Sequence, residues 1–142
     1  MNVMEWTVIQ VVTCAFMTGL IWVIQLIHYP SFSRISPASF SEFHHFHSRR
    51  ITWIVAPVMI FELISAIALV ILNPSSPMMV SNLVLLGLIW LSTFFLSVPA
   101  HNQLAQGFDE KTILRLTTTN WPRTFLWSLR LGLLVMFVGQ KF

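Results

Sequence analysis

The sequence predicts an all-α integral membrane protein, a single transmembrane domain over residues 1–142 that forms a four-helix bundle. Hydrophobic residues make up 56% of the chain and charged residues only 9%, whereas a soluble domain carries about 25% charged residues. The apolar residues also fall into four segments, each close to the length of about 20 residues that crosses a bilayer. The chain is too short to hold a separate soluble domain beside them.

The four expected spans cover residues 7–27, 51–72, 82–98 and 122–139. The first is expected to end at His28-Tyr29-Pro30 and the third at Pro99, because proline breaks helices. The second ends in an uncharged turn with two prolines, at residues 73–77. Pro122 suits the first turn of the fourth helix.

Two long connections, residues 28–50 and 101–121, are expected on one side of the membrane. Short interfacial helices are predicted within them, at residues 39–50 and from Asp109 onward. The other side has only Lys141, while this side holds six basic residues: Arg34, Arg49, Arg50, Lys111, Arg115 and Arg123. The positive-inside rule therefore predicts cytoplasmic long loops, both termini outside, and a multi-pass protein of the cell membrane.

The basic balance does not indicate nucleic-acid binding. The chain has only eight Lys and Arg residues and no basic amphipathic run. Its one cysteine, Cys14, cannot form an intrachain disulfide. The expected partners are the lipid bilayer and a lipophilic small molecule, and a homo-oligomer is left open.

Polar side chains recur at helical spacing along each apolar segment. The four sets are Cys14, Thr18, Gln25 and His28; Glu62 and Ser65; Thr93, Ser97 and His101; and Asn120, Arg123, Trp127 and Arg130. An unpaired polar group in hydrocarbon costs several kcal/mol, so these stripes are expected to face the bundle interior. For the Ser and Thr hydroxyls, a bond to the carbonyl one turn back is the alternative role.

Arg130 lies well inside the fourth segment, where an arginine costs roughly 2.5–3.5 kcal/mol on insertion scales. Glu62 lies at a similar depth, about 16 Å beyond Arg50, while Arg130 lies about 12 Å past Pro122. An ion pair between Glu62 and Arg130 is the simplest way to hold both charges. The pair could be purely structural or belong to a functional site.

Three of the histidines, His44, His45 and His47, lie in an aromatic and basic stretch of the first long connection. His44 and His47 have the i, i+3 spacing that can bind a metal, and they are the metal-ligand candidates. Lipid-headgroup contact or solvation is the alternative reading. The sequence names no cofactor.

The helix ends resemble those of the anthrone-oxygenase-like family of small four-span membrane proteins. The motifs are His28-Tyr29-Pro30 at the end of the first segment, Pro99-Ala100-His101-Asn102 at the end of the third, and Trp121 with Arg123 at the start of the fourth. The resemblance covers nearly the whole chain. It implies a four-helix fold, oxidation of polycyclic anthrones to quinones without an obvious cofactor, and site residues His28, Asn102, Trp121 and Arg123.

The leading hypothesis is a membrane oxidoreductase or oxygenase that acts on a lipophilic quinoid or phenolic substrate. His28 or His101 would act as general base, and Arg123 or Arg130 would stabilise an enolate or phenolate. Trp127 would stack on the ring. The residues expected to bind substrate are Asn102, Asn120, Trp121, Trp127, Glu62 and Gln25.

Two other classes compete with the enzyme hypothesis. The histidines could hold haem or a metal within the bundle, or the chain could be a small subunit of a larger membrane complex. A transporter is disfavoured, because four helices enclose little space and no inverted repeat with broken helices is visible. We expect the four residues His28, His101, Asn102 and Arg123 to converge at the cytoplasmic end of the bundle.

Overall fold

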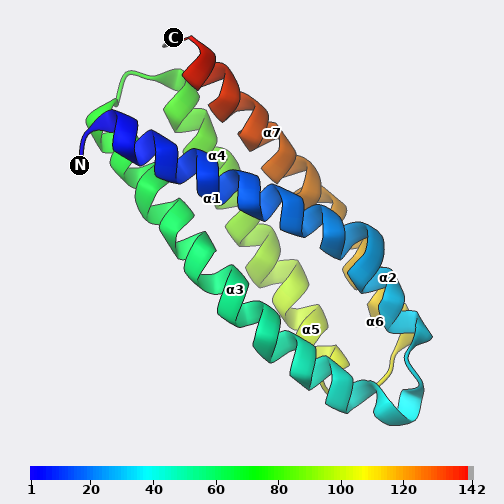
Figure 1. Cartoon of the computed structure of the whole chain (residues 1–142). Coiled ribbons are helices and arrows are strands. Elements are labelled where there is room, and N and C mark those ends of the chain that lie inside the picture. The colour runs from blue at the N-terminus through cyan, green and yellow to red at the C-terminus, as the bar shows by residue number, and fades with distance from the viewer. Residues whose placement is uncertain (141–142) are drawn as a thin grey trace.

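The computed structural model describes residues 1–140 and shows a bundle of helices with no strand in that range (Figure 1). Lys141, which entered the charge asymmetry, lies outside the described residues. The elements are α1 (Val3–Val23), η1 (Ile24–His28), α2 (Tyr29–Ser31), η2 (Phe32–Arg34), α3 (Pro37–Leu72), α4 (Pro77–Ser92), η3 (Thr93–Ser97), α5 (Val98–Leu104), α6 (Glu110–Thr119) and α7 (Trp121–Gly139).

These elements join end to end into four rods, which confirms the all-α bundle. The rods are α1–η1–α2, α3, α4–η3–α5 and α6–α7. Both long connections lie at one end of the bundle, and the chain termini lie at the other (Figure 1). We call the end with the two long connections the histidine end, because all five histidines lie in or beside them.

Three of the rods are long and apolar enough to cross a membrane: Val3–Arg34, Pro37–Leu72 and Pro77–Leu104. The helix α7 matches the expected fourth span closely but is not among these three. It carries Arg123 and Arg130, both buried, and packs against α1 and α4. The fourth helix therefore contributes two buried arginines to the interior of a bundle whose other three rods are strongly apolar.

Neither Pro30 nor Pro99 ends a helix, so the predicted ends at His28-Tyr29-Pro30 and Pro99 are wrong. A π-helical turn, η1 or η3, ends two residues before each proline. In the first, the Tyr29 N–H donates to the Ile24 carbonyl five residues back. A proline removes one N–H and clashes with the carbonyl four residues earlier. The wider π turn shifts the hydrogen-bond register at that point, and the rod continues.

The predicted division between an interfacial helix at 39–50 and a span from residue 51 is also wrong. The helix α3 is continuous from Pro37 to Leu72, a length of about 54 Å at the helical rise. Its buried residues Phe40, His44 and His47 continue the inward face that carries Met59 and Glu62. Packing of that face against the rest of the bundle holds the first turns in line with the span.

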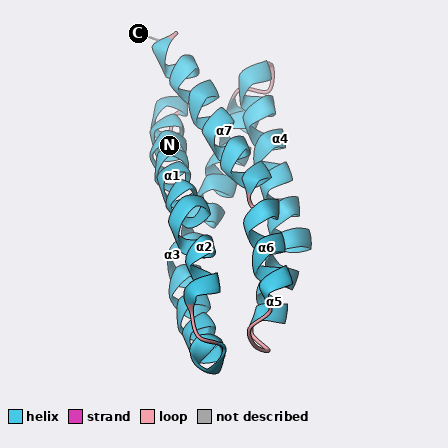
Figure 2. Cartoon of the chain, turned by 90° about the vertical axis from the view of Figure 1, so that its right-hand side faces the viewer, coloured by secondary structure: helices cyan, strands magenta, loops and turns pink. Residues whose placement is uncertain are grey.

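The short helix expected from Asp109 is present as α6. The Asp109 side chain caps it by accepting from the Thr112 backbone N–H at 3.2 Å and from the Thr112 hydroxyl. These bonds, led by the one from the hydroxyl, hold the pKa of Asp109 below its ordinary value. The helix buries Thr112, Ile113 and Leu116 and runs along α5 and α2, nearly in line with α7, and does not lie across the bundle end (Figure 2).

Candidate functional site

The polar stripes meet inside the bundle in three groups. A deep layer surrounds Glu62 and Arg130, a middle layer surrounds Arg123, and a histidine cluster occupies the histidine end. These groups come from all four rods, so the stripes face inward as the sequence predicts.

The deep layer contains the predicted ion pair. Arg130 Nη1 donates to Glu62 Oε1 at 2.8 Å, and both side chains are fully buried. Trp127 Nε1 donates to the second carboxylate oxygen at 3.1 Å, and Arg130 Nε donates to Asn82 Oδ1 at 3.1 Å. Further from the histidine end, the Ser65 hydroxyl donates to the Gln10 side-chain amide oxygen. Such additional hydrogen bonds offset part of the cost of burying two charges, and Arg130 Nη2 is left without a hydrogen-bond partner among the described residues.

The middle layer fixes the position of Arg123. Its Nη1 donates to Ser97 Oγ at 2.8 Å and to Asn120 Oδ1 at 3.0 Å. Asn120 in turn donates to the Gln25 amide oxygen at 2.8 Å. The guanidinium also lies over the Trp127 ring, 5.3 Å from its centre. Three rods therefore hold one arginine, and no carboxylate among residues 1–140 forms an ion pair with it.

The histidine cluster is built from ring-to-ring hydrogen bonds. His28 Nε2 lies 2.8 Å from His47 Nδ1, and His101 Nδ1 lies 3.1 Å from His44 Nε2. The second nitrogen of His101 is 3.1 Å from the Tyr29 hydroxyl. One nitrogen of each histidine pair must accept, so each pair includes at least one neutral imidazole. His101 is thus the link between a phenol and a second histidine.

An aromatic core keeps these histidines in place. Phe32 is fully buried, and its ring packs against the rings of His28, His44 and His47 at centroid distances of 5.2, 6.0 and 5.4 Å. The π turn and the following turns of the first rod deliver both His28 and Phe32 to this point. The cluster therefore depends on the first rod continuing past Pro30.

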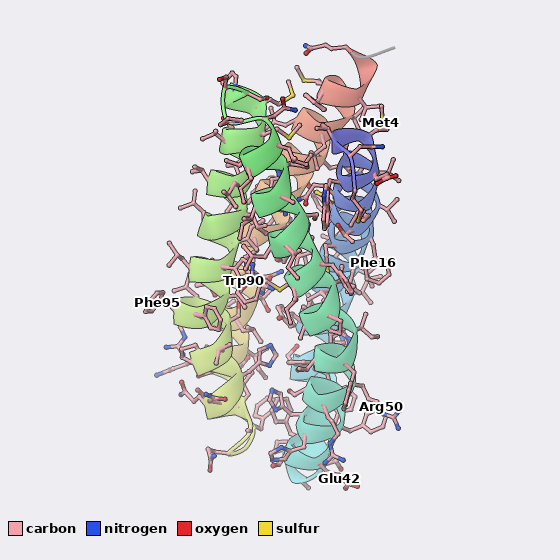
Figure 3. The ribbon with its side chains drawn as sticks, turned by 90° about the vertical axis from the view of Figure 1, so that its left-hand side faces the viewer. Met4, Phe16, Glu42, Arg50, Trp90 and Phe95 are labelled. Atoms are coloured by element: carbon pink, nitrogen blue, oxygen red, sulfur yellow. The ribbon has the colours of Figure 1, made fainter. Side chains whose placement is uncertain are left out.

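A cleft of about 440 Å³ lies beside the cluster, between α3 and the rod α4–η3–α5. One end is polar and is lined by Tyr29, His47, Ser48, His101, Asn102 and Arg123. The other end is apolar and is lined by Val55, Ala56, Met59, Trp90 and Phe94, among others. Figure 3 looks onto this side of the bundle, with Trp90 between the two rods and Phe95 pointing outward. The rim residues Thr52, Phe94 and Val98 are exposed.

Helix lengths place the cleft relative to a bilayer. The segment of α3 from Trp53 to Leu72 has 20 residues, and its only ionisable residue is the buried Glu62. Twenty helical residues span about 30 Å, the thickness of the hydrocarbon core. The hydrocarbon boundary then falls near Arg50, so His47 lies at the headgroup level and Met59 within the hydrocarbon. The cleft crosses that boundary with its polar end outward.

The expected site residues divide between the cleft and its supports. His101, Asn102 and Arg123 line the cleft, and His28 reaches it through its bond to His47. Gln25 and Asn120 do not line it and instead hold Arg123. Trp121 packs against Trp22 and Phe125, outside the cleft.

The deep-layer residues take other positions than the substrate hypothesis requires. Arg130, Glu62 and Trp127 do not line the cleft, because they bond to one another. Trp127 is fully buried, so its ring faces Arg123 and not a ligand. The structure therefore favours Arg123 over Arg130 as the cation of the site.

Three residues of the site have no role in the sequence-based hypothesis. Tyr29 is the single tyrosine of the chain and sits inside the His28-Tyr29-Pro30 motif, which was a usable signal. Trp90 lines the apolar end of the cleft. Asn82 bonds Arg130, and an asparagine within an apolar segment was the available signal for that role.

The metal-ligand candidates His44 and His47 both turn inward, and one ring nitrogen of each bonds to another histidine, His101 for His44 and His28 for His47. Within residues 1–140, no group of three or more His, Cys, Asp or Glu side chains is arranged to hold a metal ion. His45 lies on the opposite, exposed face of α3.

The fold and this site define a helical membrane protein with a polar interior and a cleft at one end. Comparison of the sequence with protein-family models, with curated proteins and with solved structures found no match. The interpretation of the site therefore depends on its own geometry.

Proposed function

We propose that the protein is a membrane oxidoreductase or oxygenase whose substrate is a lipophilic quinoid or phenolic molecule. The observation that carries this proposal is the composition of the cleft. Its polar end holds the hydrogen-bonded Tyr29 and His101 together with Arg123, and its other end is lined by apolar side chains. A planar aromatic substrate with oxygen substituents matches both ends. Such a molecule would enter sideways past Phe94 and Val98, which form the exposed rim.

The groups at the polar end suit proton removal from a weak carbon or phenol acid. His101 would accept the proton, and Arg123, which forms no ion pair within residues 1–140, would stabilise the resulting enolate or phenolate oxygen. The hydrogen bonds between Tyr29 and His101 and between His101 and His44 would pass that proton as far as His44. His28 contacts the cleft only indirectly, through its hydrogen bond to His47.

For an anthrone-type substrate, the oxidant is dioxygen and the balance is simple. The ring methylene and one O₂ become a ring carbonyl and one water. The carbon loses four electrons and O₂ gains four. The new carbonyl keeps one oxygen atom, and both methylene hydrogens end in the water. The chain's own groups supply proton removal and anion stabilisation, which make the carbon electron-rich enough to react.

The resemblance to the anthrone-oxygenase-like family supports the proposal in one respect. The motifs that carry it, at His28, Asn102 and Arg123, come from three separate helix ends, and all of them lie at or beside the cleft. Trp121, the fourth motif residue, lies outside it. Family membership and the cytoplasmic placement of the histidine end remain part of the proposal.

The test is a direct assay on the purified chain in lipid nanodiscs. A hydroxyanthrone is added in air, and quinone absorbance and oxygen uptake are followed together. We expect His101→Gln to lower the rate by about 10²-fold or more, the usual contribution of a general base. His45→Gln is the matched control, because His45 is exposed and outside the cleft. Oxidation no faster than in empty nanodiscs, or equal rates in both variants, would exclude this function.

The four clustered histidine rings favour a second candidate, a haem- or metal-binding module. His28, His44 and His47 each use one ring nitrogen in a bond to another histidine, and their second ring nitrogens are the ones a haem iron or metal ion would take. Absorbance in the Soret region and elemental analysis of the purified protein decide between the two candidates. Stoichiometric haem or metal, lost in His47→Gln but kept in His45→Gln, would establish the second one.

A further inference from the structure

The outward face of α3 carries a groove that plays no part in the cleft. Its volume is about 460 Å³, and its lining residues are Glu42, His45, Phe46, Arg49, Arg50 and Trp53. We call it the outer groove. Glu42 and Arg50 point away from the other rods in Figure 3. The lining residues recur every three or four positions, so they share one helix face, whereas His44 and His47 face inward.

The outer groove has two positive charges without an acidic partner. Arg49 and Arg50 are exposed, and the single ion pair within residues 1–140 is the one between Arg130 and Glu62. The Arg50 guanidinium lies over the Phe46 ring, 5.4 Å from its centre, which limits its range of positions. Glu42 lies about two turns away from Arg49, at the end of the groove farther from the hydrocarbon.

The depth of the outer groove matches the level of lipid phosphates. Arg49 and Arg50 come just before the 20-residue apolar stretch of α3 that matches the hydrocarbon thickness. Trp53 is 76% exposed and begins that stretch. Below it, Ile60 and Ile64 are exposed on the same face, at seven- and eleven-residue spacing. The face therefore offers two cations, then an aromatic ring, then an apolar stripe.

We propose that the outer groove binds an anionic phospholipid. Its phosphate oxygens accept hydrogen bonds from Arg49 and Arg50, since a guanidinium suits phosphate geometry. Its acyl chains run along Trp53, Ile60 and Ile64. This order of charge and apolar surface complements a phospholipid from headgroup to tail. The site is independent of the function proposed for the cleft.

Native mass spectrometry of the full chain in detergent tests the proposal, with phosphatidylglycerol and phosphatidylcholine of identical acyl chains as probes. The wild type should bind one molecule of phosphatidylglycerol roughly 30-fold more tightly than one molecule of phosphatidylcholine. This preference corresponds to a factor of about five to six for each arginine near the headgroup level. The double change Arg49→Gln/Arg50→Gln should abolish this preference. The control Arg34→Gln/Lys111→Gln removes the same charge from the same end of the bundle but outside the outer groove, and it should retain the preference.

Two results would overturn the proposal. One is equal binding of the two lipids by the wild type. The other is an equal loss of preference in both double variants, which would show that net charge, and not the outer groove, selects the lipid. The helix content of each variant, measured by circular dichroism, shows that the comparison is made between folded proteins.

Discussion

At the scale of single residues, the pair of Glu62 and Arg130 is the single ion pair within residues 1–140, and both side chains are fully buried. Neither charge reaches solvent, and each has one further partner from another helix, Trp127 for Glu62 and Asn82 for Arg130. Removing one member leaves the other charged and unpaired, whereas removing both leaves neutral groups. The two changes must therefore be strongly non-additive.

We predict that Glu62→Gln and Arg130→Met each destabilise the protein by roughly 3–5 kcal/mol, the cost of leaving a buried charge unpaired. The double variant should lose less stability than the sum of the two single variants. Melting in detergent, followed by circular dichroism, measures all three. Arg115→Met is the control for loss of one positive charge, because Arg115 is exposed. Additive effects of the two single changes would show that the residues are not coupled.

Residue patterns predicted the inward stripes and the Glu62–Arg130 pair, because few polar groups exist and each must face the interior. They did not show which arginine lines the cleft. That choice depends on Asn82 and Ser97, which come from a rod distant in sequence and bond Arg130 and Arg123 respectively. The two roles expected for the Ser and Thr hydroxyls both occur. Thr18 and Thr93 donate to the carbonyl one turn back, whereas the Ser97 hydroxyl accepts from Arg123.

At the scale of elements, the rule that proline ends a helix failed at the two prolines that follow a π turn. The sequence around Pro30 and Pro99 contains an ordinary helix-ending signal, and nothing local marks the π turn before it. The consequence for the site is direct. Tyr29 and His101 lie just beyond the two π turns, and they meet at a hydrogen bond of 3.1 Å because both rods continue.

We predict that α3 is one continuous helix through the boundary near Arg50, with its internal proline, Pro57, well beyond that boundary. Spin labels at Ser39 and Ile60, both exposed, are 21 residues apart, and a continuous helix separates their backbones by about 32 Å. A helix broken at Arg50, with its first part flat on the membrane, would give about 22 Å. Pulsed electron paramagnetic resonance distinguishes these distances in a Cys14→Ala background.

The control for that measurement uses a second pair within the undisputed span. Labels at Ile60 and Ile71, which are both exposed, should give about 17 Å whether or not the helix bends near Arg50. A short Ser39–Ile60 distance beside a correct Ile60–Ile71 distance would restore the interfacial helix. It would also divide the outer groove described above, because residues 42–50 would no longer share one helix face with Trp53.

At the scale of the whole molecule, the bundle is polarised along its axis. Residues 1–33 and 51–110 contain no Lys or Arg, so the described basic residues outside the deep and middle layers all belong to the histidine end. The cleft and the outer groove lie at that same end. Composition and charge distribution were sufficient to predict this polarity, because the bilayer limits helix length and the placement of charge. The side of the membrane on which the histidine end lies is a separate question, which the charges answer only as a prediction.

We predict that the histidine end faces the cytoplasm, because basic residues near span ends favour that side. In a Cys14→Ala background, single cysteines at Ser36 and Gln106 should be protected from a membrane-impermeant thiol reagent in intact cells. A cysteine at Gln140, at the opposite end, should react. All three positions are exposed, so accessibility within the fold does not limit labelling. Permeabilised cells are the control, and there all three should react. Labelling of Ser36 and Gln106 but not Gln140 in intact cells would invert the topology, and the cleft would then receive its substrate from the outer leaflet.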